Sequence, residues 1–186
     1  LSVCQESGVT PLLTVAIGSG TPQEAEEWAA YCAAWYHARK QKAPRIYWQI
    51  GNEEAGAWEH GNMTGEMYVE TLREFVPGIR RAYPNSRIIA VGADTYHNLK
   101  ETGPWRAVIL DQAAEHFDLL SLHPYAISAW ENDPAVRQGK ILQVSQKGIK
   151  TVQDLIGDLQ IRGLRDKKVA VTEWGLWLKA NSYDEQ

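Results

Sequence analysis

The sequence has 186 residues, with 19 Lys and Arg against 23 Asp and Glu, and a formal net charge of −4. A hydrophobic fraction of 44% and a charged fraction of 23% are ordinary for a globular domain, and they exclude a disordered, collagen-like or low-complexity chain. The acidic balance has no basic stripe, so we expect no nucleic-acid partner. No apolar run approaches the length of a membrane span, so we expect no membrane partner either.

Two further features of the composition bear on function. Cys4 and Cys32 have no CxxC spacing, so we expect ordinary thiols and no metal knuckle. The chain has eight Trp and eight Tyr but only two Phe. Trp and Tyr combine an apolar ring with a polar group, which suits surfaces that are partly wet, such as interfaces and sugar-binding clefts.

The first predicted strand spans 11–17 and is followed by a glycine-rich turn. Thr21-Pro22-Gln23-Glu24 then has the pattern of a capping box with proline at the first helical position, which predicts a helix over 22–40. Apolar residues recur along this helix at intervals of three and four, which predicts one buried stripe. The stripe consists of Ala25, Trp28, Ala29, Cys32, Trp35 and Tyr36.

The second predicted strand, 46–50, runs directly into Gly51-Asn52-Glu53-Glu54. A helix is predicted over 65–82, with a kink or a break at Pro77 and Gly78. The remaining predicted elements are a strand at 87–93 that closes on Asp94, a helix at 105–115, a strand at 117–123, a long connection at 126–146, a helix at 148–161 and a strand at 168–173.

Strands and helices alternate along the whole chain, which indicates βαβ units around a parallel sheet. The strand spacing fits the roughly 31 residues per unit of an eight-stranded barrel of about 250 residues. We therefore predict an α/β fold of the (β/α)8 TIM-barrel type, of which this chain supplies about five βα units. A doubly wound open sheet is the alternative, but no nucleotide-binding glycine motif follows any predicted strand.

Polar residues follow four of the five predicted strands, where (β/α) barrels place their functional groups. They are Asn52, Glu53, Asp94, His123, Tyr125, Glu173 and Trp174. Three strand-helix units separate Glu53 from Glu173, which would place the two glutamates on opposite sides of one barrel mouth. Glycoside hydrolysis requires two carboxylates opposed in this way. Either glutamate alone is better explained by an ion pair with Arg or Lys of a neighbouring loop.

Three segments resemble motifs of the clan A glycoside hydrolases. Trp48-Gln-Ile-Gly-Asn-Glu53 resembles their fourth-strand motif, Ser121-Leu-His-Pro-Tyr125 their sixth-strand segment, and Thr172-Glu-Trp-Gly175 their seventh-strand nucleophile motif. The segment 11–32 is similar to the third strand and helix of family 51 α-L-arabinofuranosidases. The resemblance covers strands three to seven of eight. Family 51 usually has Asp-Glu-Trp-Asn at the nucleophile, so relatives of the family 39 β-xylosidases and family 79 glucuronidases stay open.

The resemblance implies a retaining glycoside hydrolase that works by double displacement. It makes Glu173 the nucleophile and Glu53 the general acid and base. It further implies that Tyr125 donates a hydrogen bond to Glu173, that His123 binds the acid/base or the sugar, and that Asn52 binds the sugar 2-hydroxyl. From the residues alone, Tyr125 fits interfacial packing, His123 a satisfied core histidine, and Asn52 an Asx-turn.

Other residues of the same strand ends and loops have weaker assignments. Trp174 and Trp48 are candidates for a platform under a sugar face, or for packing. Glu54 and Asp94 are predicted to anchor loops beside the site, with substrate binding as the alternative for Asp94. The candidate subsite walls are Trp58, Trp130 and Trp177.

We expect a carbohydrate substrate, no cofactor and no metal. Two other functions stay open: a barrel lyase that holds a divalent metal with Glu53, Asp94, Glu173 and His123, and a glycan-binding barrel without catalysis. We expect residues 1–186 to form one partial catalytic barrel domain that other segments, of the same or another chain, complete. The sequence leaves open whether the protein is cytoplasmic or secreted, and whether it forms a homo-oligomer.

Overall fold

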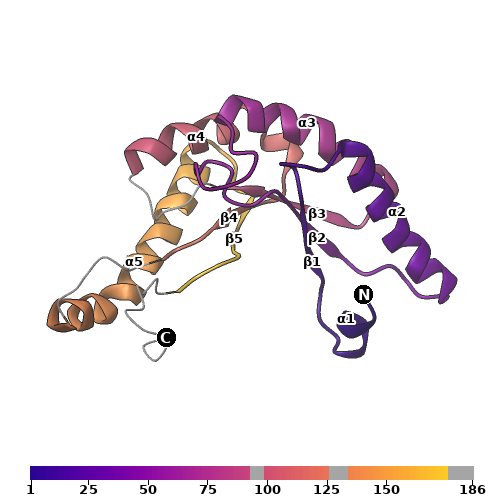
Figure 1. Cartoon of the computed structure of the whole chain (residues 1–186), viewed down its shortest axis with the longest axis horizontal. Coiled ribbons are helices and arrows are strands. Elements are labelled where there is room, and N and C mark those ends of the chain that lie inside the picture. Colours follow the sequence, from indigo (N-terminus) through magenta and orange to yellow (C-terminus); the bar gives the residue numbers. More distant parts are fainter. Residues whose placement is uncertain (93–98, 126–133, 176–186) are drawn as a thin grey trace.

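The computed structural model describes residues 1–92, 99–125 and 134–175, in which five parallel strands form one sheet (Figure 1). The strands are β1 (Leu12–Val15), β2 (Ile46–Ile50), β3 (Ser86–Val91), β4 (Leu119–Leu122) and β5 (Lys168–Val171). The helices are α1 (Ser2–Glu6), α2 (Pro22–Ala38), α3 (Gly65–Ala82), α4 (Leu99–Gln112), α5 (Pro134–Ile161) and the 3-10 helix η1 (Ala114–His116).

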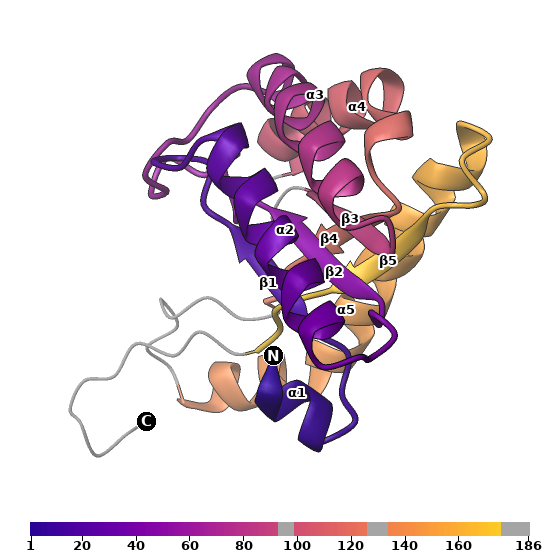
Figure 2. The same cartoon turned by 90° about the vertical axis from the view of Figure 1, so that its right-hand side faces the viewer.

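The strand order is β1-β2-β3-β4-β5, so each strand pairs in parallel with the next strand along the chain. Both views of the molecule show α2, α3 and α4 on one side of the sheet (Figures 1 and 2). A doubly wound sheet would reverse its strand order and carry helices on both faces. The predicted α/β fold, with five units of the barrel type, is therefore confirmed, and the doubly wound alternative is excluded.

Helix α2 begins as its capping box predicts. The Thr21 hydroxyl accepts a hydrogen bond from the backbone N–H of Glu24 at 3.2 Å, and the Glu24 carboxylate accepts one from the backbone N–H of Thr21 at 2.8 Å. The predicted stripe is buried at Ala25, Ala29, Cys32 and Tyr36. Trp28 corrects that prediction, because it is 39% exposed, although its ring meets Trp48 edge-on, and Trp35 is only partly buried.

Helix α3 continues through Pro77 and Gly78, so of the predicted kink or break, the break is wrong. Pro77 is exposed, and so is Arg73, the residue four positions earlier whose carbonyl has no N–H partner at the proline. Gly78 is buried against α2, where a Cβ atom would lie 3.0 Å from Glu26 Oε2. The small residue therefore permits close helix packing and does not end the helix.

Two helices are longer than predicted. Helix α4 starts at Leu99, before the predicted 105, and continues through Pro104. Helix α5 starts at Pro134, so the prediction of a long connection over 126–146 is wrong for its second part, while 126–133 lies outside the described residues. Neither of these added segments has a clear apolar stripe, and an apolar stripe is the pattern that predicts a helix from sequence.

The core lies between the sheet and the helices that cover it. Its largest fully buried side chains include Trp48, Tyr68, Tyr83, Phe117 and Leu72.

The loop after β1 and the loop after β2 touch through their backbones, since a Cβ atom on either Gly18 or Gly61 would overlap the other loop. None of the described helices is both long and apolar enough to cross a membrane.

Candidate active site

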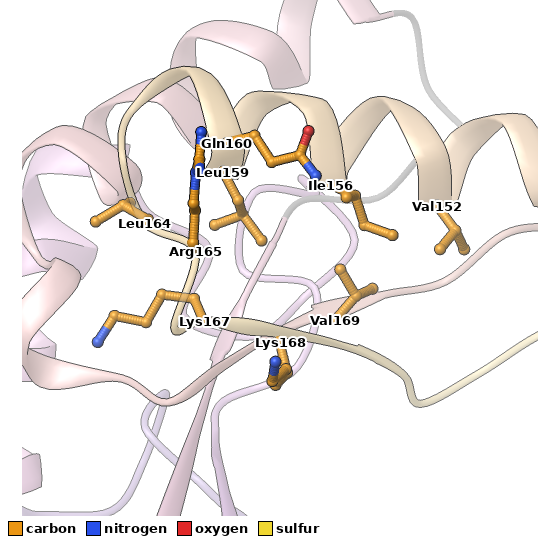
Figure 3. Close-up of a pocket in the computed structure, with 9 residues that line it drawn as sticks. All are labelled: Val152, Ile156, Leu159, Gln160, Leu164, Arg165, Lys167, Lys168 and Val169. Carbon is orange, nitrogen blue, oxygen red and sulfur yellow. The ribbon is translucent and has the colours of Figure 1, made fainter.

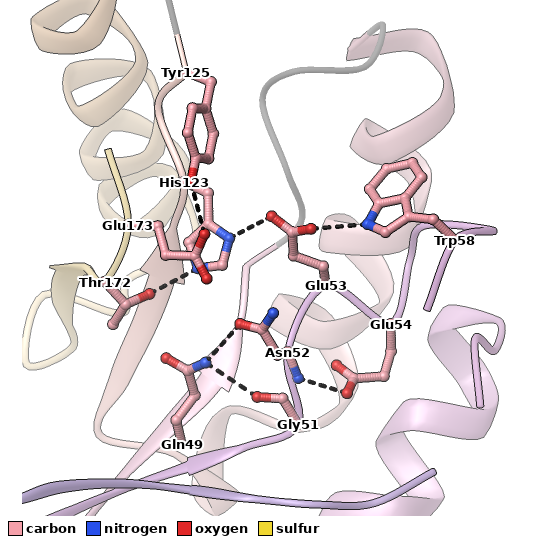
Figure 4. A network of polar contacts seen from close by, with 10 residues as sticks. All are labelled: Gln49, Gly51, Asn52, Glu53, Glu54, Trp58, His123, Tyr125, Thr172 and Glu173. Carbon is pink, nitrogen blue, oxygen red and sulfur yellow. Dashed lines mark hydrogen bonds and ion pairs between the residues drawn. The ribbon is translucent and has the colours of Figure 1, made fainter. Parts of the chain in front are cut away.

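Glu53, His123 and Glu173 meet at the carboxyl ends of β2, β4 and β5 (Figure 4). Each of the three residues offers one side-chain nitrogen or oxygen atom, and these three atoms all lie within 4.8 Å of one another. Parallel strands bring their carboxyl ends to the same edge of a sheet, which explains how residues 120 positions apart come together. The expected convergence of the two glutamates is thus present.

The backbone of the turn after β2 directs Glu53 into the site. Gly51 has a φ of +81°, and Glu53 itself has a φ of +59°. The left-handed region costs a residue with a side chain about 1–3 kcal/mol, and such residues persist only where the surroundings fix them. The surroundings of Glu53 therefore have to hold this turn.

Two side chains hold the Glu53 carboxyl group. His123 Nδ1 lies 2.6 Å from Glu53 Oε1, and Trp58 Nε1 donates a hydrogen bond to Glu53 Oε2 at 2.8 Å. Trp58 belongs to the loop between β2 and α3 and is itself exposed. The carboxyl group is therefore fixed from the sheet on one side and from a surface loop on the other (Figure 4).

His123 is buried and links the two halves of the site. Its Nε2 atom lies 2.9 Å from the Thr172 hydroxyl and 3.8 Å from Glu173 Oε1. The backbone N–H of Thr172 donates to the carbonyl of Leu122 at 3.2 Å, which continues the β4–β5 pairing and sets Thr172 beside the histidine. The imidazole therefore contacts the Glu53 side through one nitrogen and the Glu173 side through the other.

Glu173 is oriented by Tyr125. The phenol hydroxyl donates a hydrogen bond to Glu173 Oε2 at 2.8 Å. Tyr125 and Gly175 form an isolated parallel bridge, so the strand pairing resumes beyond the ends of β4 and β5. This bridge holds Tyr125 beside the backbone two residues after Glu173.

Asn52 and Glu54 support the turn that carries Glu53. The backbone N–H of Asn52 donates to Glu54 Oε1 at 2.5 Å, while Gln49 Nε2 donates to Asn52 Oδ1 at 3.2 Å and to the Gly51 carbonyl at 3.1 Å. Glu54 is buried, and this burial raises its pKa from the ordinary 4.5 to about 7. The two neighbouring residues of Glu53 thus have closely packed, hydrogen-bonded environments.

Not all predicted site residues come to this place. Trp48 is fully buried and packs against Trp28 of α2, in the layer between sheet and helix and away from Glu53 and Glu173. Trp174 is highly exposed. Three predicted residues, Asp94, Trp130 and Trp177, lie outside the described residues.

The structure adds two residues that the sequence did not single out, Thr172 and Gln49. Thr172 stood inside the recognised nucleophile motif, and its position one residue before Glu173 was the available signal. Gln49 is a polar residue inside a buried strand, and its side chain is buried as well. A polar residue in an apolar strand must find a hydrogen-bond partner, so it could have been a signal for a supporting role.

The Glu53, His123 and Glu173 set could in principle also ligate a divalent ion, because it offers one imidazole nitrogen and two carboxylate oxygens. Both His123 nitrogens already lie at hydrogen-bond distance from Glu53 and Thr172. Binding a metal through this histidine would require one of those contacts to break. The observed geometry instead joins the three residues directly.

Comparison with known proteins finds curated α-L-arabinofuranosidases that are similar to this chain in sequence. No family model matches the chain. A curated intracellular exo-α-L-arabinofuranosidase from Bacteroides ovatus is 27% identical over 204 residues, which cover 95% of this chain and 37% of the relative. A curated intracellular exo-α-(1→5)-L-arabinofuranosidase from Acetivibrio thermocellus is 27% identical over 150 residues, which cover 80% of this chain and 29% of the relative.

Solved structures show the same fold. The solved structure of a family 51 α-L-arabinofuranosidase from Bifidobacterium longum matches with a TM-score of 0.72 at 23% identity, over 95% of this chain and 38% of that one. The chain therefore spans well under half the length of the relatives that it matches. It is related in sequence to curated α-L-arabinofuranosidases and has the fold of part of the family 51 (β/α)8 barrel.

Proposed function

We propose that the protein is a retaining glycoside hydrolase that acts on α-L-arabinofuranosides. The observation that carries the proposal is the pair of glutamates, Glu53 and Glu173, at the ends of β2 and β5. One carboxylate oxygen of Glu53 lies within 4.8 Å of one carboxylate oxygen of Glu173. Retaining enzymes hold their two carboxyl groups about 5–5.5 Å apart, whereas inverting enzymes leave about 6.5–9.5 Å for a water molecule. The choice of arabinofuranoside rests on the curated relatives.

In the first step, a Glu173 oxygen attacks the anomeric carbon and forms a glycosyl-enzyme. The bond from that carbon to the leaving oxygen breaks as Glu53 transfers its proton to this oxygen. The Tyr125 hydroxyl donates a hydrogen bond to Glu173 Oε2 at 2.8 Å and so orients the carboxylate for this attack. Asn52 is the residue that would bind the sugar 2-hydroxyl.

In the second step, Glu53 acts as a base. It removes a proton from a water molecule whose oxygen attacks the anomeric carbon, and the bond to Glu173 breaks. Two inversions at the same carbon retain its configuration. The protein returns to its starting state with Glu53 protonated and Glu173 ionised.

The surroundings of the two glutamates support this division of roles. The Glu53 side chain is 15% exposed and the Glu173 side chain 40% exposed. A resting acid must keep its proton, and burial favours the protonated form of a carboxyl group. The more buried residue is the one assigned as the acid.

A trapping experiment tests the proposal. A deoxyfluoro arabinofuranoside with a good leaving group should form a stable ester with Glu173, and peptide mass spectrometry would locate the adduct. A glycan-binding barrel without catalysis would form no adduct, and loss of turnover in a chelator would favour the metal-dependent lyase. Faster turnover of aryl β-xylosides or glucuronides would move the substrate to the family 39 or family 79 alternatives.

We also propose that further barrel segments, from this protein or another chain, complete the sheet. Strand β5 is the outermost strand of the described sheet on one side, and Val171 on it is 45% exposed. A cavity of about 660 Å³ opens between β5 and α5 (Figure 3). It is lined by Val152, Ile156, Leu159, Gln160, Leu164, Arg165, Lys167, Lys168 and Val169.

The next strand and helix of a barrel would cover the exposed edge of β5. The relatives are longer than this chain, which supports the presence of such a strand and helix. Residues 1–186 would then form one partial barrel domain. The test compares these residues alone with the product of the complete open reading frame by thermal unfolding and gel filtration. Equal stability and activity of the isolated segment would contradict the proposal.

The names of the relatives favour an intracellular location, which fractionation of the native host would test.

A further inference from the structure

Glu54 is a buried carboxyl group directly behind the acid/base and has no direct role in the steps above. It is 5% exposed. Its Oε1 atom accepts the hydrogen bond from the backbone N–H of Asn52 at 2.5 Å, and its Oε2 atom has no hydrogen-bond partner among the described residues. A carboxyl group in such a place is costly, so its presence needs an explanation.

The Glu54 carboxyl group fills the space beneath the turn. A Cβ atom at Gly51 would overlap all three atoms of this carboxyl group, so the group lies directly against the Gly51 Cα atom. It therefore touches both residues that precede Glu53, one by packing and the other by a hydrogen bond. The turn between β2 and Glu53 cannot relax toward α3 while the Glu54 side chain is in place.

The backbone of Glu54 is anchored as well. Its carbonyl accepts a hydrogen bond from the Met63 N–H at 2.9 Å, and the Met63 carbonyl accepts one from Trp105 Nε1 at 3.2 Å. Trp105 belongs to α4, so this chain of contacts ties the loop after β2 to the helical layer. Glu54 is thus a fixed support rather than a mobile loop residue.

We propose that Glu54 is a positioning residue that holds the Gly51–Asn52 turn and so aims Glu53 at the oxygen of the leaving group. The inference rests on the proposed function of Glu53. Proton transfer requires the donor to lie within hydrogen-bond reach of that oxygen. A misplacement of about 1 Å can cost about 10²-fold in rate. Without its support, the left-handed backbone at Glu53 would be free to relax.

The test measures kcat/KM for two aryl arabinofuranosides, using the product of the complete open reading frame. Dinitrophenolate leaves without protonation, whereas methoxyphenolate needs the proton from Glu53. Glu54→Leu keeps the bulk but removes the acceptor, and it should lose about 10²-fold on the methoxyphenyl substrate and far less on the dinitrophenyl substrate. Glu54→Gln, whose amide oxygen can accept the same bond, should recover most of the lost activity.

Two further variants complete the design. Glu54→Asp keeps the carboxyl group but shortens its reach, and it should show the same leaving-group-dependent loss if the leucine variant does not fold. Glu66→Gln, which changes an exposed residue in the first turn of α3, is the matched control and should behave as wild type.

Each other result overturns the proposal. Wild-type rates in Glu54→Leu on both substrates would show that the turn needs no support, and equal losses on both would show a general disruption. Failure of Glu54→Gln to recover activity would remove the role of the accepted hydrogen bond. If wild type turned over neither substrate, the proposed function itself would fail, and this outcome is recognised without any Glu54 variant.

Discussion

The two sides of the site hold their glutamates in different ways. On the β2 side, Glu53 has a left-handed backbone, and its carboxyl group is bound by His123 and by Trp58. On the β5 side, Glu173 follows a strand whose pairing resumes at Gly175, and its carboxylate accepts a hydrogen bond from Tyr125. A strained turn fixes the first group, whereas regular pairing fixes the second. The difference fits a proton donor that must be aimed and shielded, and a nucleophile that must be oriented but stay ionised.

The largest expected effect comes from the β5 side. Glu173→Ala removes the nucleophile, and the loss in kcat should approach the roughly 10⁶-fold measured for such residues in other covalent enzymes. Added azide should restore turnover and give a glycosyl azide of inverted configuration, which proton NMR would identify. Near wild-type turnover in Glu173→Ala would show that another group is the nucleophile.

An alanine substitution on the β2 side, followed by added azide, should give a different result. Glu53→Ala removes the general acid and base and should cost about 10²–10⁴-fold on methoxyphenyl arabinofuranoside, with a smaller loss on the dinitrophenyl substrate. Azide should then give a product of retained configuration, because Glu173 still forms the intermediate. If both variants gave the same azide anomer, the assigned roles of the two residues would be wrong.

Tyr125→Phe tests how Glu173 is oriented. The change removes a hydrogen bond to a charged group, which contributes about 1.5–3 kcal/mol, so kcat should fall by about 10-fold to 10²-fold. The loss should be similar for good and poor leaving groups, since the proton donor is untouched. A loss confined to poor leaving groups would place Tyr125 with the acid and not with the nucleophile.

The last expected effect is on stability rather than on turnover, and it concerns the support of the β2 side. Burial raises the pKa of Glu54 from 4.5 to about 7, so the folded protein holds a proton that the unfolded chain releases between these pH values. The contribution of Glu54 to stability should therefore be fully present below pH 4.5 and be lost as the pH rises to about 7, by about 3 kcal/mol at most. Glu54→Gln should remove this slope in urea unfolding, and an unchanged slope would contradict the assignment.

Sequence periodicity was sufficient for elements that carry a buried stripe or a clear start signal. Strand β2 and helix α3 have the predicted bounds, and the capping box begins α2 at Pro22. Periodicity failed where no apolar stripe exists, as in the first turns of α5. Proline did not mark a break in α3, where the helix continues through the exposed Pro77.

For the site as well, some features could be predicted from the sequence and others could not. Strand ends predicted which polar residues converge, because parallel strands share one edge. The predicted role of Trp48 depended on which face of β2 it occupies, and the sequence pattern of a strand buried on both faces does not distinguish them. The contact of Glu53 with Trp58 depends on the course of an irregular loop, which leaves no periodic signal in the sequence.

The close approach of Gly18 and Gly61 has a consequence for anyone who redesigns this protein. The two loops that carry these glycines share a boundary at which neither has room for a single carbon atom more. A library that varies one loop to admit a larger substrate would, at these two positions, displace its neighbour and with it the loop of the acid/base. Diversification should therefore keep both glycines, and also Trp58 because it binds the Glu53 carboxyl group, and should vary the exposed side chains of Ala57 and His60 instead.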